Sequence, residues 1–358
     1  TRVKLSANWM APAGHPGEDA NLYETVEAIG LELCPQLGLS IPVGKDSMSM
    51  KTVWREDEIE KAVTAPVSLI ISAFAPVVDV RKTLTPVLQT PEKATQLVYI
   101  DLGNGKNRLG GSALAQVYQQ LGNDAPDIDQ PAQLKAFFEL IQSWNAQGRL
   151  LAYHDRSDGG LFVTIAEMVF AGQVGVNIVL PHAENALGQL FSEELGAVVQ
   201  LYEEEVKAFI EAAKQANLTA GVLGFITQDV DKISIIMNNQ VIFSEPYHAL
   251  QKTWTETSYR LQALRDNPSC AEEEFEIVGE RDTALYAELS YDINAEVAAP
   301  FVQTGVRPPV AILREQGVNG QVEMAAAFER AGFSPVDVTM HDILTGQVGL
   351  ADFKGLVA

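Results

Sequence analysis

Short apolar runs of strand length alternate with helix-like periodicity through the middle of the chain, and this alternation constrains the fold most. Strands are expected at residues 97–101, 150–153, 174–180, 196–201, 221–226 and 233–237. The helices between them are expected at residues 112–121, 133–147, 161–171, 186–192 and 203–216. Elements in this order bury one or both faces of a sheet against helices. Residues 86–245 are therefore predicted to form an α+β layered domain.

The segment before this domain predicts a smaller α+β part. Apolar residues at helical spacing predict a helix over residues 19–35, which Pro35 and Gly38 are expected to end. The apolar run from Val67 to Phe74 predicts a buried strand, limited by Pro76. These elements assign residues 1–85 to a domain of their own.

Two further parts follow residue 245. Residues 246–304 are expected to contain a helix over 247–265 and then an acidic, linker-like stretch over 268–300. A strand at 310–313, a helix at 321–331 and a strand at 336–338 predict the opening of a parallel βαβ domain over residues 305–358.

Composition narrows the classes of function. Forty-seven acidic residues against 25 basic residues give a formal net charge of −22, which repels nucleic acid and anionic membranes. No apolar run reaches the roughly 18 residues that a membrane span needs. Cys34 and Cys270 are far apart and form no CxxC, which indicates a reducing compartment and a soluble, cytoplasmic protein. The start at Thr1 and the apolar end at Ala358 predict a piece cut from a longer enzyme.

The sharpest motif is HDRSDGG at residues 154–160, between a predicted strand and a predicted helix. Asp155 and Asp158 offer oxygen ligands to Mg²⁺, which favours carboxylates together with phosphate oxygens and water. Ser157 and the first amides of the following helix suit a phosphate. The alternative is a tight turn in which Asp158 caps the helix and the glycines serve only the backbone.

A second candidate lies at residues 44–47, where Gly44, Lys45 and Ser47 could approach and hold a phosphate. The spacing is not that of a P-loop, and a surface turn with a solvated lysine is the alternative. The glycine-rich stretch at 103–112 lacks the dinucleotide-binding fingerprint and is interpreted as a connector. His15 stands alone in a loop, which is more typical of a structural or solvent-facing histidine.

Five segments together resemble one family, the large single-chain phosphoribosylformylglycinamidine synthases, also called formylglycinamide ribonucleotide amidotransferases. The segments are LSANWM at 5–10, IPVGKDSMSM at 41–50, HDRSDGGL at 154–161, EELGAV at 193–198 and AILREQGVN at 311–319. The resemblance runs through the whole chain in the family's order. It implies an α+β fold made of the second aminoimidazole-ribonucleotide-synthetase-like half, with N-type and C-type parts, followed by the first βαβ unit of an α/β class I glutaminase.

The resemblance also implies a reaction in purine biosynthesis. ATP phosphorylates the formyl-amide oxygen of formylglycinamide ribonucleotide, and ammonia released from glutamine displaces the phosphate to give the amidine. The family's magnesium-binding aspartate falls on Asp155 and its nucleotide-binding serine on Ser157, so ATP or ADP with Mg²⁺ is the expected cofactor. Gly44, Lys45 and Ser47 occupy a place where relatives contact nucleotide or substrate phosphate. Lys45-Asp46 stands here where the smaller relatives have asparagine, so the ligand roles of Gly44, Lys45 and Ser47 stay open.

Other parts of the family's machinery are expected outside residues 1–358. The catalytic histidine of the first half and further magnesium ligands are expected before Thr1, and the glutaminase nucleophile after Ala358. The chain alone is therefore expected to be inactive, with the rest of its own chain as partner. Its nucleotide site is either a reacting site or a structural ADP site, and the structural site is favoured. The alternatives are a non-catalytic scaffold and another superfamily member such as aminoimidazole ribonucleotide synthetase. Residues 307–358 argue against the second alternative, because those smaller enzymes do not continue into a βαβ unit.

Overall fold

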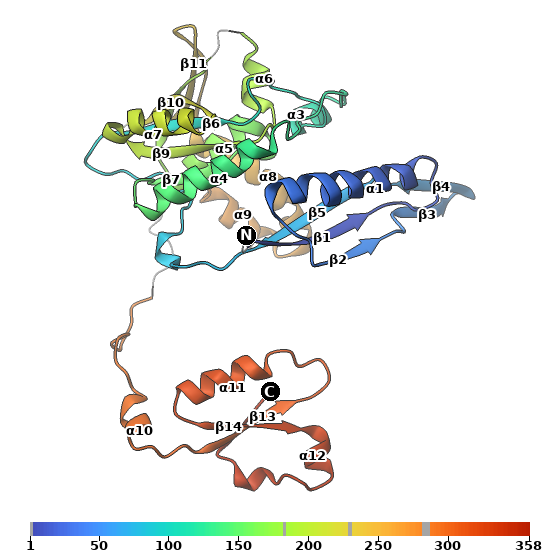
Figure 1. Cartoon of the computed structure of the whole chain (residues 1–358), viewed down its shortest axis with the longest axis vertical. Helices are drawn as coiled ribbons and strands as arrows, with labels where there is room; N and C mark the ends of the chain where they lie inside the picture. Colours follow the sequence, from blue (N-terminus) through green and yellow to red (C-terminus); the bar gives the residue numbers. More distant parts are fainter. Residues whose placement is uncertain (1–2, 182–183, 228–230, 281–286) are drawn as a thin grey trace. The chain divides into compact units, whose positions relative to one another are not determined.

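The computed structural model describes residues 3–181, 184–227, 231–280 and 287–358. The chain divides into two compact units, Thr1–Arg281 and Asp282–Ala358, and each unit is described by itself. Figure 1 labels the helices and strands of both.

A three-stranded sheet with the order β2-β1-β5 begins the first unit. β1 (Lys4–Met10) is parallel to β2 (Val43–Ser47) and antiparallel to β5 (Ser68–Phe74). Between β1 and β2 the chain is helical in three consecutive pieces: α1 (Glu18–Glu27), the π-helical η1 (Ala28–Leu33) and α2 (Cys34–Leu37). The helix predicted over residues 19–35 is thus confirmed.

The end of this helical segment differs in part from the prediction. Pro35 lies in the first turn of α2, so the expectation that it ends the helix is wrong. The helical backbone continues through Leu33 and Cys34, and the turn just before the proline is π-helical, so the proline is accommodated within a helical run. Gly38 ends the segment in the left-handed conformation, with φ 68°, as expected.

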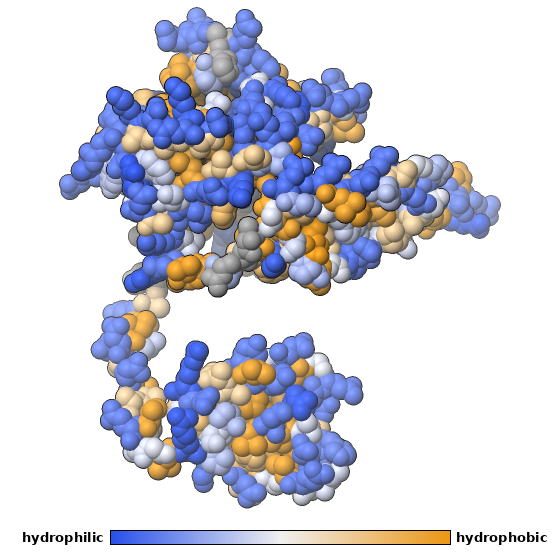
Figure 2. Space-filling view, viewed as in Figure 1, coloured by the Kyte–Doolittle hydropathy of each residue, from blue (hydrophilic) through white to orange (hydrophobic). Residues whose placement is uncertain are grey.

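A hairpin that the sequence did not predict follows β2. β3 (Lys51–Glu56) and β4 (Ile59–Thr64) pair antiparallel around the two-residue turn Asp57-Glu58. β5 is a strand as predicted, but the expectation that it is buried is wrong, since Ile70 is 54% and Phe74 60% exposed. Figure 2 shows hydrophobic surface over this part of the first unit.

A seven-stranded sheet with the order β12-β11-β8-β10-β6-β9-β7 forms the larger part of the first unit. Its strands are β6 (Thr95–Asp101), β7 (Ala152–Asp155), β8 (Gly175–Val179), β9 (Gly196–Tyr202), β10 (Thr219–Thr227), β11 (Lys232–Met237) and β12 (Gln240–Pro246). β8 and β11 are parallel, and the other neighbours are antiparallel. Six of these strands were predicted, and β12 was not.

Helices cover both faces of this sheet (Figure 1). One hydrophobic cluster packs α5 (Gly160–Gly172), α6 (Ala186–Phe191) and the start of α8 (Tyr247–Arg265) on the sheet. The other cluster packs α4 (Pro131–Ala146) and α7 (Glu203–Gln215). Neighbouring residues of one strand belong to different clusters, Val198 to the first and Val199 to the second, because side chains alternate across a strand.

Three short or irregular stretches surround these layers. η2 (Val80–Lys82) precedes β6, and α3 (Ala113–Val117) is shorter than the helix predicted over residues 112–121. The stretch after α8, predicted to be linker-like, contains the helix α9 (Pro268–Glu276), so this prediction is wrong over those residues. α9 lies against α8, where the rings of Tyr259 and Phe275 stack with centroids 4.4 Å apart. Residues 281–286 of the predicted linker lie outside the described residues.

The second unit has a three-stranded parallel sheet with the order β14-β13-β15. Its elements are α10 (Ala299–Gln303), β13 (Pro309–Arg314), α11 (Gln321–Arg330), β14 (Ser334–Thr339), α12 (Met340–Leu344), η3 (Leu350–Asp352) and β15 (Gly355–Val357). The central strand is the most buried, with Val310, Ala311 and Ile312 at most 2% exposed. The predicted parallel βαβ unit is confirmed.

The predicted α+β fold class is therefore confirmed. The domain boundaries proposed at residues 85, 245 and 304 stay predictions. Over the part of the chain that the structure describes, no helix combines the length and the apolar character required to cross a membrane.

Candidate functional site

The HDRSDGG segment forms the connection from β7 to α5. β7 ends at Asp155, and α5 begins at Gly160. Gly159 and Gly160 both have left-handed backbone, with φ of 79° and 70°. A Cβ at Gly159 would lie 2.3 Å from Val163 Cγ2, and one at Gly160 would lie 2.7 Å from Leu190 O. The two glycines therefore permit a turn that other residues would strain or block.

This turn places Asp155 and Ser157 together on its outer side. The Ser157 hydroxyl donates a hydrogen bond of 2.9 Å to Asp155 Oδ2. The Asp155 side chain is 63% exposed, so its carboxylate is accessible to a ligand. The structure thus brings these two predicted site residues into contact, although it does not test their roles.

His154 adjoins this pair. Its Nδ1 lies 3.7 Å from Asp155 Oδ1, and its Nε2 lies 2.7 Å from Glu167 Oε2. The imidazole of His154 and then the hydroxyl of Ser157 lower the pKa of Asp155 to about 2. The carboxylates of Asp155 and Glu167 raise the pKa of His154. Asp155 is therefore ionised at neutral pH, as a metal ligand must be.

One sequence expectation for this turn is wrong. The helix N-cap is Gly159, and no side chain caps α5, so Asp158 does not have the capping role considered for it. Two amides at the start of α5 already have acceptors within the protein. Gly159 N–H donates to Glu193 Oε1 at 2.8 Å, and Gly160 N–H donates to Ser157 O at 3.0 Å. The exposed polar side chains of the turn are those of Asp155, Ser157 and Asp158.

The second candidate lies on β2. Lys45 and Ser47 are two residues apart and therefore share one face of the strand. Lys45 Nζ donates a hydrogen bond to Ser47 Oγ at 3.0 Å. Gly44 lies on the other face, where a Cβ would come within 2.4 Å of Ala7 O on β1. Glycine at this position is therefore required by the close pairing of β1 and β2, whatever it does for a ligand.

The structure adds a residue to this face that the sequence analysis did not select. Asn8 on β1 is the register partner of Lys45 on β2, so the two side chains share a face of the sheet. Asn8 Oδ1 is buried and has no hydrogen-bond partner among the described residues. A buried acceptor without a donor is costly, and a ligand is one way to satisfy it. Only strand register could have revealed this neighbour.

Within the described ranges, no hydrogen bond or ion pair connects the Lys45–Ser47 pair to the Asp155–Ser157 pair. In the same residues, no group of three or more His, Cys, Asp or Glu side chains is arranged to hold a metal ion. Asp158 is a second exposed carboxylate of the turn. Asp155 fits Mg²⁺ in the common arrangement in which phosphate oxygens and waters complete the shell, and it does not form a cage of protein ligands.

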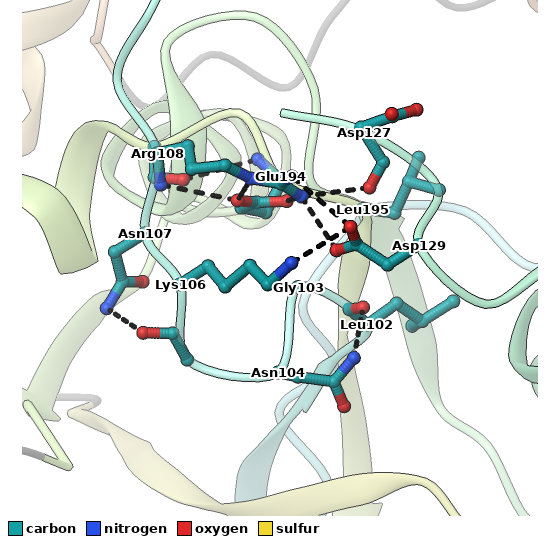
Figure 3. A network of polar contacts seen from close by, with 12 residues as sticks. Leu102, Gly103, Asn104, Lys106, Asn107, Arg108, Asp127, Asp129, Glu194 and Leu195 are labelled. Atoms are coloured by element: carbon teal, nitrogen blue, oxygen red, sulfur yellow. Dashed lines mark hydrogen bonds and ion pairs between the residues drawn. The ribbon is translucent and has the colours of Figure 1, made fainter. Parts of the chain in front are cut away.

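The glycine-rich stretch at 103–112 is a structured connector, as interpreted. It holds a buried ion pair in which Arg108 Nε lies 2.6 Å from Glu194 Oε1, with side chains only 8% and 1% exposed (Figure 3). His15 lies in an exposed turn, where its N–H donates to Pro12 O. Cys34 is buried and Cys270 exposed, and both are free thiols.

Three family models match the chain, in the order expected from the sequence. The model described as the FGAR-AT PurM N-like domain matches residues 1–76, FGAR-AT being formylglycinamide ribonucleotide amidotransferase. The C-terminal domain of AIR synthase related proteins matches residues 98–236, and the CobB/CobQ-like glutamine amidotransferase domain matches residues 307–358. Residues 1–76 thus match a domain specific to formylglycinamide ribonucleotide amidotransferases, and the two other matches are to the domain types that the resemblance implies. The resemblance recognised in its motifs is confirmed.

Solved structures of Thermotoga maritima PurL are similar in fold to this chain. The structure complexed with FGAR has a TM-score of 0.52 at 14% identity, covering 70% of this chain and 39% of that one. The complex with ATP has a TM-score of 0.50 at 13% identity, covering 70% and 38%. A structure of phosphoribosylformylglycinamidine synthase II from Thermotoga maritima has a TM-score of 0.50 at 11% identity, covering 93% and 44%. The chain thus spans less than half the length of these proteins.

Proposed function

We propose that residues 1–358 act within an ATP-dependent amidotransferase of purine biosynthesis. The complete enzyme converts formylglycinamide ribonucleotide, ATP, glutamine and water to formylglycinamidine ribonucleotide, ADP, phosphate and glutamate. ATP phosphorylates the formyl-amide oxygen, and ammonia then displaces that phosphate to form the amidine.

The observation that carries this proposal is the combination of domains in one chain. An amidotransferase-specific N-type domain, a synthetase-like C-type domain and a glutamine amidotransferase segment follow one another. The glutamine amidotransferase segment disfavours aminoimidazole ribonucleotide synthetase and related kinases, because those enzymes use no glutamine. Structures of PurL complexed with ATP and with FGAR support a nucleotide and this substrate as ligands.

We assign Asp155 to Mg²⁺ and Ser157 to the nucleotide. Mg²⁺ would neutralise phosphate charge and connect the phosphates to the protein. Asp155 supplies the ionised oxygen ligand, since its pKa is held at about 2. Ser157 already donates to Asp155 Oδ2 and orients that carboxylate, and its Oγ retains acceptor capacity for a ligand. A structural ADP site is favoured over a reacting site.

The β2 face supplies a second group of ligand contacts in this proposal. Lys45 provides a cation and Ser47 a hydroxyl for a phosphate of nucleotide or substrate. Asn8 Oδ1 lacks a donor and would accept a hydrogen bond from a ligand N–H or O–H. A fully ionised phosphate ester would not satisfy it, because its oxygens can only accept hydrogen bonds.

The chain alone is proposed to catalyse nothing. Residues 307–358 contain no cysteine, whereas the class I glutaminase that this segment resembles needs a cysteine nucleophile. The proposed partners are therefore a first synthetase-like half and a complete glutaminase domain. The free thiols of Cys34 and Cys270 agree with a reducing, cytoplasmic setting.

The test is ADP release by the complete enzyme in glutamine and MgATP, with and without formylglycinamide ribonucleotide. The proposal expects ADP release that depends on this substrate and is matched by glutamate formation. ADP release that ignores the substrate would refute the assigned reaction. Asp155→Asn then separates two kinds of site, because a structural ADP site loses thermal stability and bound ADP, whereas a reacting site loses kcat in a stable enzyme.

A further inference from the structure

The turn that carries Asp155 and Ser157 is anchored by the residue between them. The Arg156 side chain is only 1% exposed and points into the protein, away from the accessible carboxylate of Asp155. Its Nη2 donates to Asp101 Oδ1 at 3.1 Å and to Leu195 O at 3.1 Å, and its Nε donates to Glu194 O. A buried guanidinium held by three hydrogen bonds fixes the direction in which its backbone faces.

The acceptor side chain in this anchor is itself held in place. Asp101 ends β6, and its carboxylate accepts hydrogen bonds from Gly103 N at 3.0 Å and Gly105 N at 2.7 Å. The Tyr99 hydroxyl also donates to Asp101, at 3.2 Å. Asp101 thus organises the start of the glycine-rich stretch and pairs with Arg156 at the same time.

The segment that accepts from Arg156 is fixed by a second ion pair. Glu194 receives Arg108 Nε at 2.6 Å and Nη2 at 2.8 Å, in a two-bond contact shown in Figure 3. Arg108 also contacts Asp129 Oδ2 at 3.0 Å, and Lys106 Nζ lies 2.9 Å from the other oxygen of Asp129. The Glu194 backbone therefore offers Arg156 a rigid acceptor.

The far end of the turn is tied to the same segment through Glu193. One carboxylate oxygen, Oε1, accepts from Gly159 N at 2.8 Å and from Ala113 N at 2.8 Å. Arg156 holds the turn to residues 194–195, and Glu193 holds it two residues after Ser157. The turn is therefore fastened on both sides of Ser157 to one short segment, EEL at 193–195.

We propose that Arg156 and Glu193 are positioning residues that hold Asp155 and Ser157 in the geometry required for a magnesium nucleotide. This inference rests on the proposed function. Neither residue contacts the ligand. A turn that is fixed before binding loses less conformational entropy when it closes on a ligand. The carboxylate of Glu193 accepts hydrogen bonds from the amides of Gly159 and Ala113, so these amides need not change partner when a phosphate binds.

The test measures MgADP affinity of the complete enzyme by calorimetry and its thermal midpoint in parallel. Glu193→Ala removes the acceptor shared by Gly159 and Ala113 and is expected to weaken MgADP binding about 10- to 100-fold. Glu193→Gln retains an acceptor oxygen and is expected to bind within about threefold of the wild type. Arg156→Lys keeps the charge but not the planar fork, and is expected to weaken binding as Glu193→Ala does.

A matched control separates positioning from loss of stability. Arg149→Lys disturbs the ion pair of Arg149 with Glu205, which lies outside the turn, and should lower the thermal midpoint without changing the affinity. The inference is overturned if Asp155→Asn weakens MgADP binding but a folded Glu193→Ala or Arg156→Lys variant binds MgADP as tightly as the wild type. If the wild type binds no MgADP, or Asp155→Asn has no effect, the proposed nucleotide site fails and the inference fails with it.

Discussion

At the scale of single residues, the end of β7 joins two ionisable groups whose pKa values move apart. The pKa of Asp155 is lowered to about 2, first by His154, and the pKa of His154 is raised, first by Asp155 and then by Glu167. Each group favours the charged form of the other, since opposite charges within a few ångströms stabilise one another. Asp155 therefore stays ionised over the physiological range, and His154 is the group that titrates.

His154 gives the first prediction in the ligand-free protein. Its folded pKa exceeds the usual value of about 6.5, so its contribution to stability is complete below that pH and disappears as pH rises through the folded pKa. We expect NMR titration of the ring to report the raised value. Glu167→Gln should lower it, because that change removes the charge 2.7 Å from Nε2.

Glu204→Gln is the control, because Glu204 pairs with Lys93 and not with His154. A pKa of His154 that stays the same in Glu167→Gln would contradict this account of the site.

At the scale of elements, β10 shows how a sheet depends on one missing side chain. β10 lies between β6 and β8, and its register with β6 shifts between Val222 and Gly224. A Cβ on Gly224 would lie 2.0 Å from Asn177 O of β8. The backbone oxygen of a paired strand cannot move aside without loss of the pairing, so glycine is required here.

Two alanine substitutions on this strand should therefore differ. Gly224→Ala is expected to lower the free energy of unfolding by about 1–3 kcal/mol, the usual cost of overpacking. Gly221→Ala is the control, since no atom lies within 4 Å of the added Cβ. It should be neutral or stabilise slightly, by about 0.4–1 kcal/mol at most, because alanine restricts the unfolded chain. Urea unfolding measures both, and equal effects would refute the clash.

Elements with a local signal could be predicted, and those that depend on distant partners could not. The helix predicted over residues 247–265 has the same bounds in the structure. The β3–β4 hairpin was missed because its turn, Asp57-Glu58, has left-handed φ values of 50° and 65° without the glycine that usually marks such turns. α9 was taken for a linker because Phe275 packs on Tyr259, which no periodicity reveals.

The same distinction applies to the candidate site. Asp155 and Ser157 are two residues apart, so their motif alone indicated that they lie together. Arg108 and Glu194 are 86 residues apart, and Asn8 meets Lys45 only through the register of β1 and β2. Such contacts follow from the tertiary fold, which a single sequence does not show.

At the scale of the whole molecule, each compact unit carries a core of its own. Both large hydrophobic clusters consist of residues in Thr1–Arg281. The second unit buries Val310, Ala311 and Ile312 of its central strand, together with Val338 of β14. Units that bury separate cores can unfold in separate steps, and a two-state description then fails.

A matched pair of conservative substitutions tests this independence. Ile235 in the first unit and Ile312 in the second are each 2% exposed, and each isoleucine-to-valine change should cost about 0.5–1.5 kcal/mol. Calorimetry of the whole chain should resolve two transitions. Ile235→Val should lower the midpoint temperature of one transition, and Ile312→Val should lower that of the other. For the same loss of stability, the midpoint should shift further in the smaller second unit. One shared transition that both substitutions lower would mean that the units unfold cooperatively, so that the glutaminase-like segment draws its stability from the synthetase-like half.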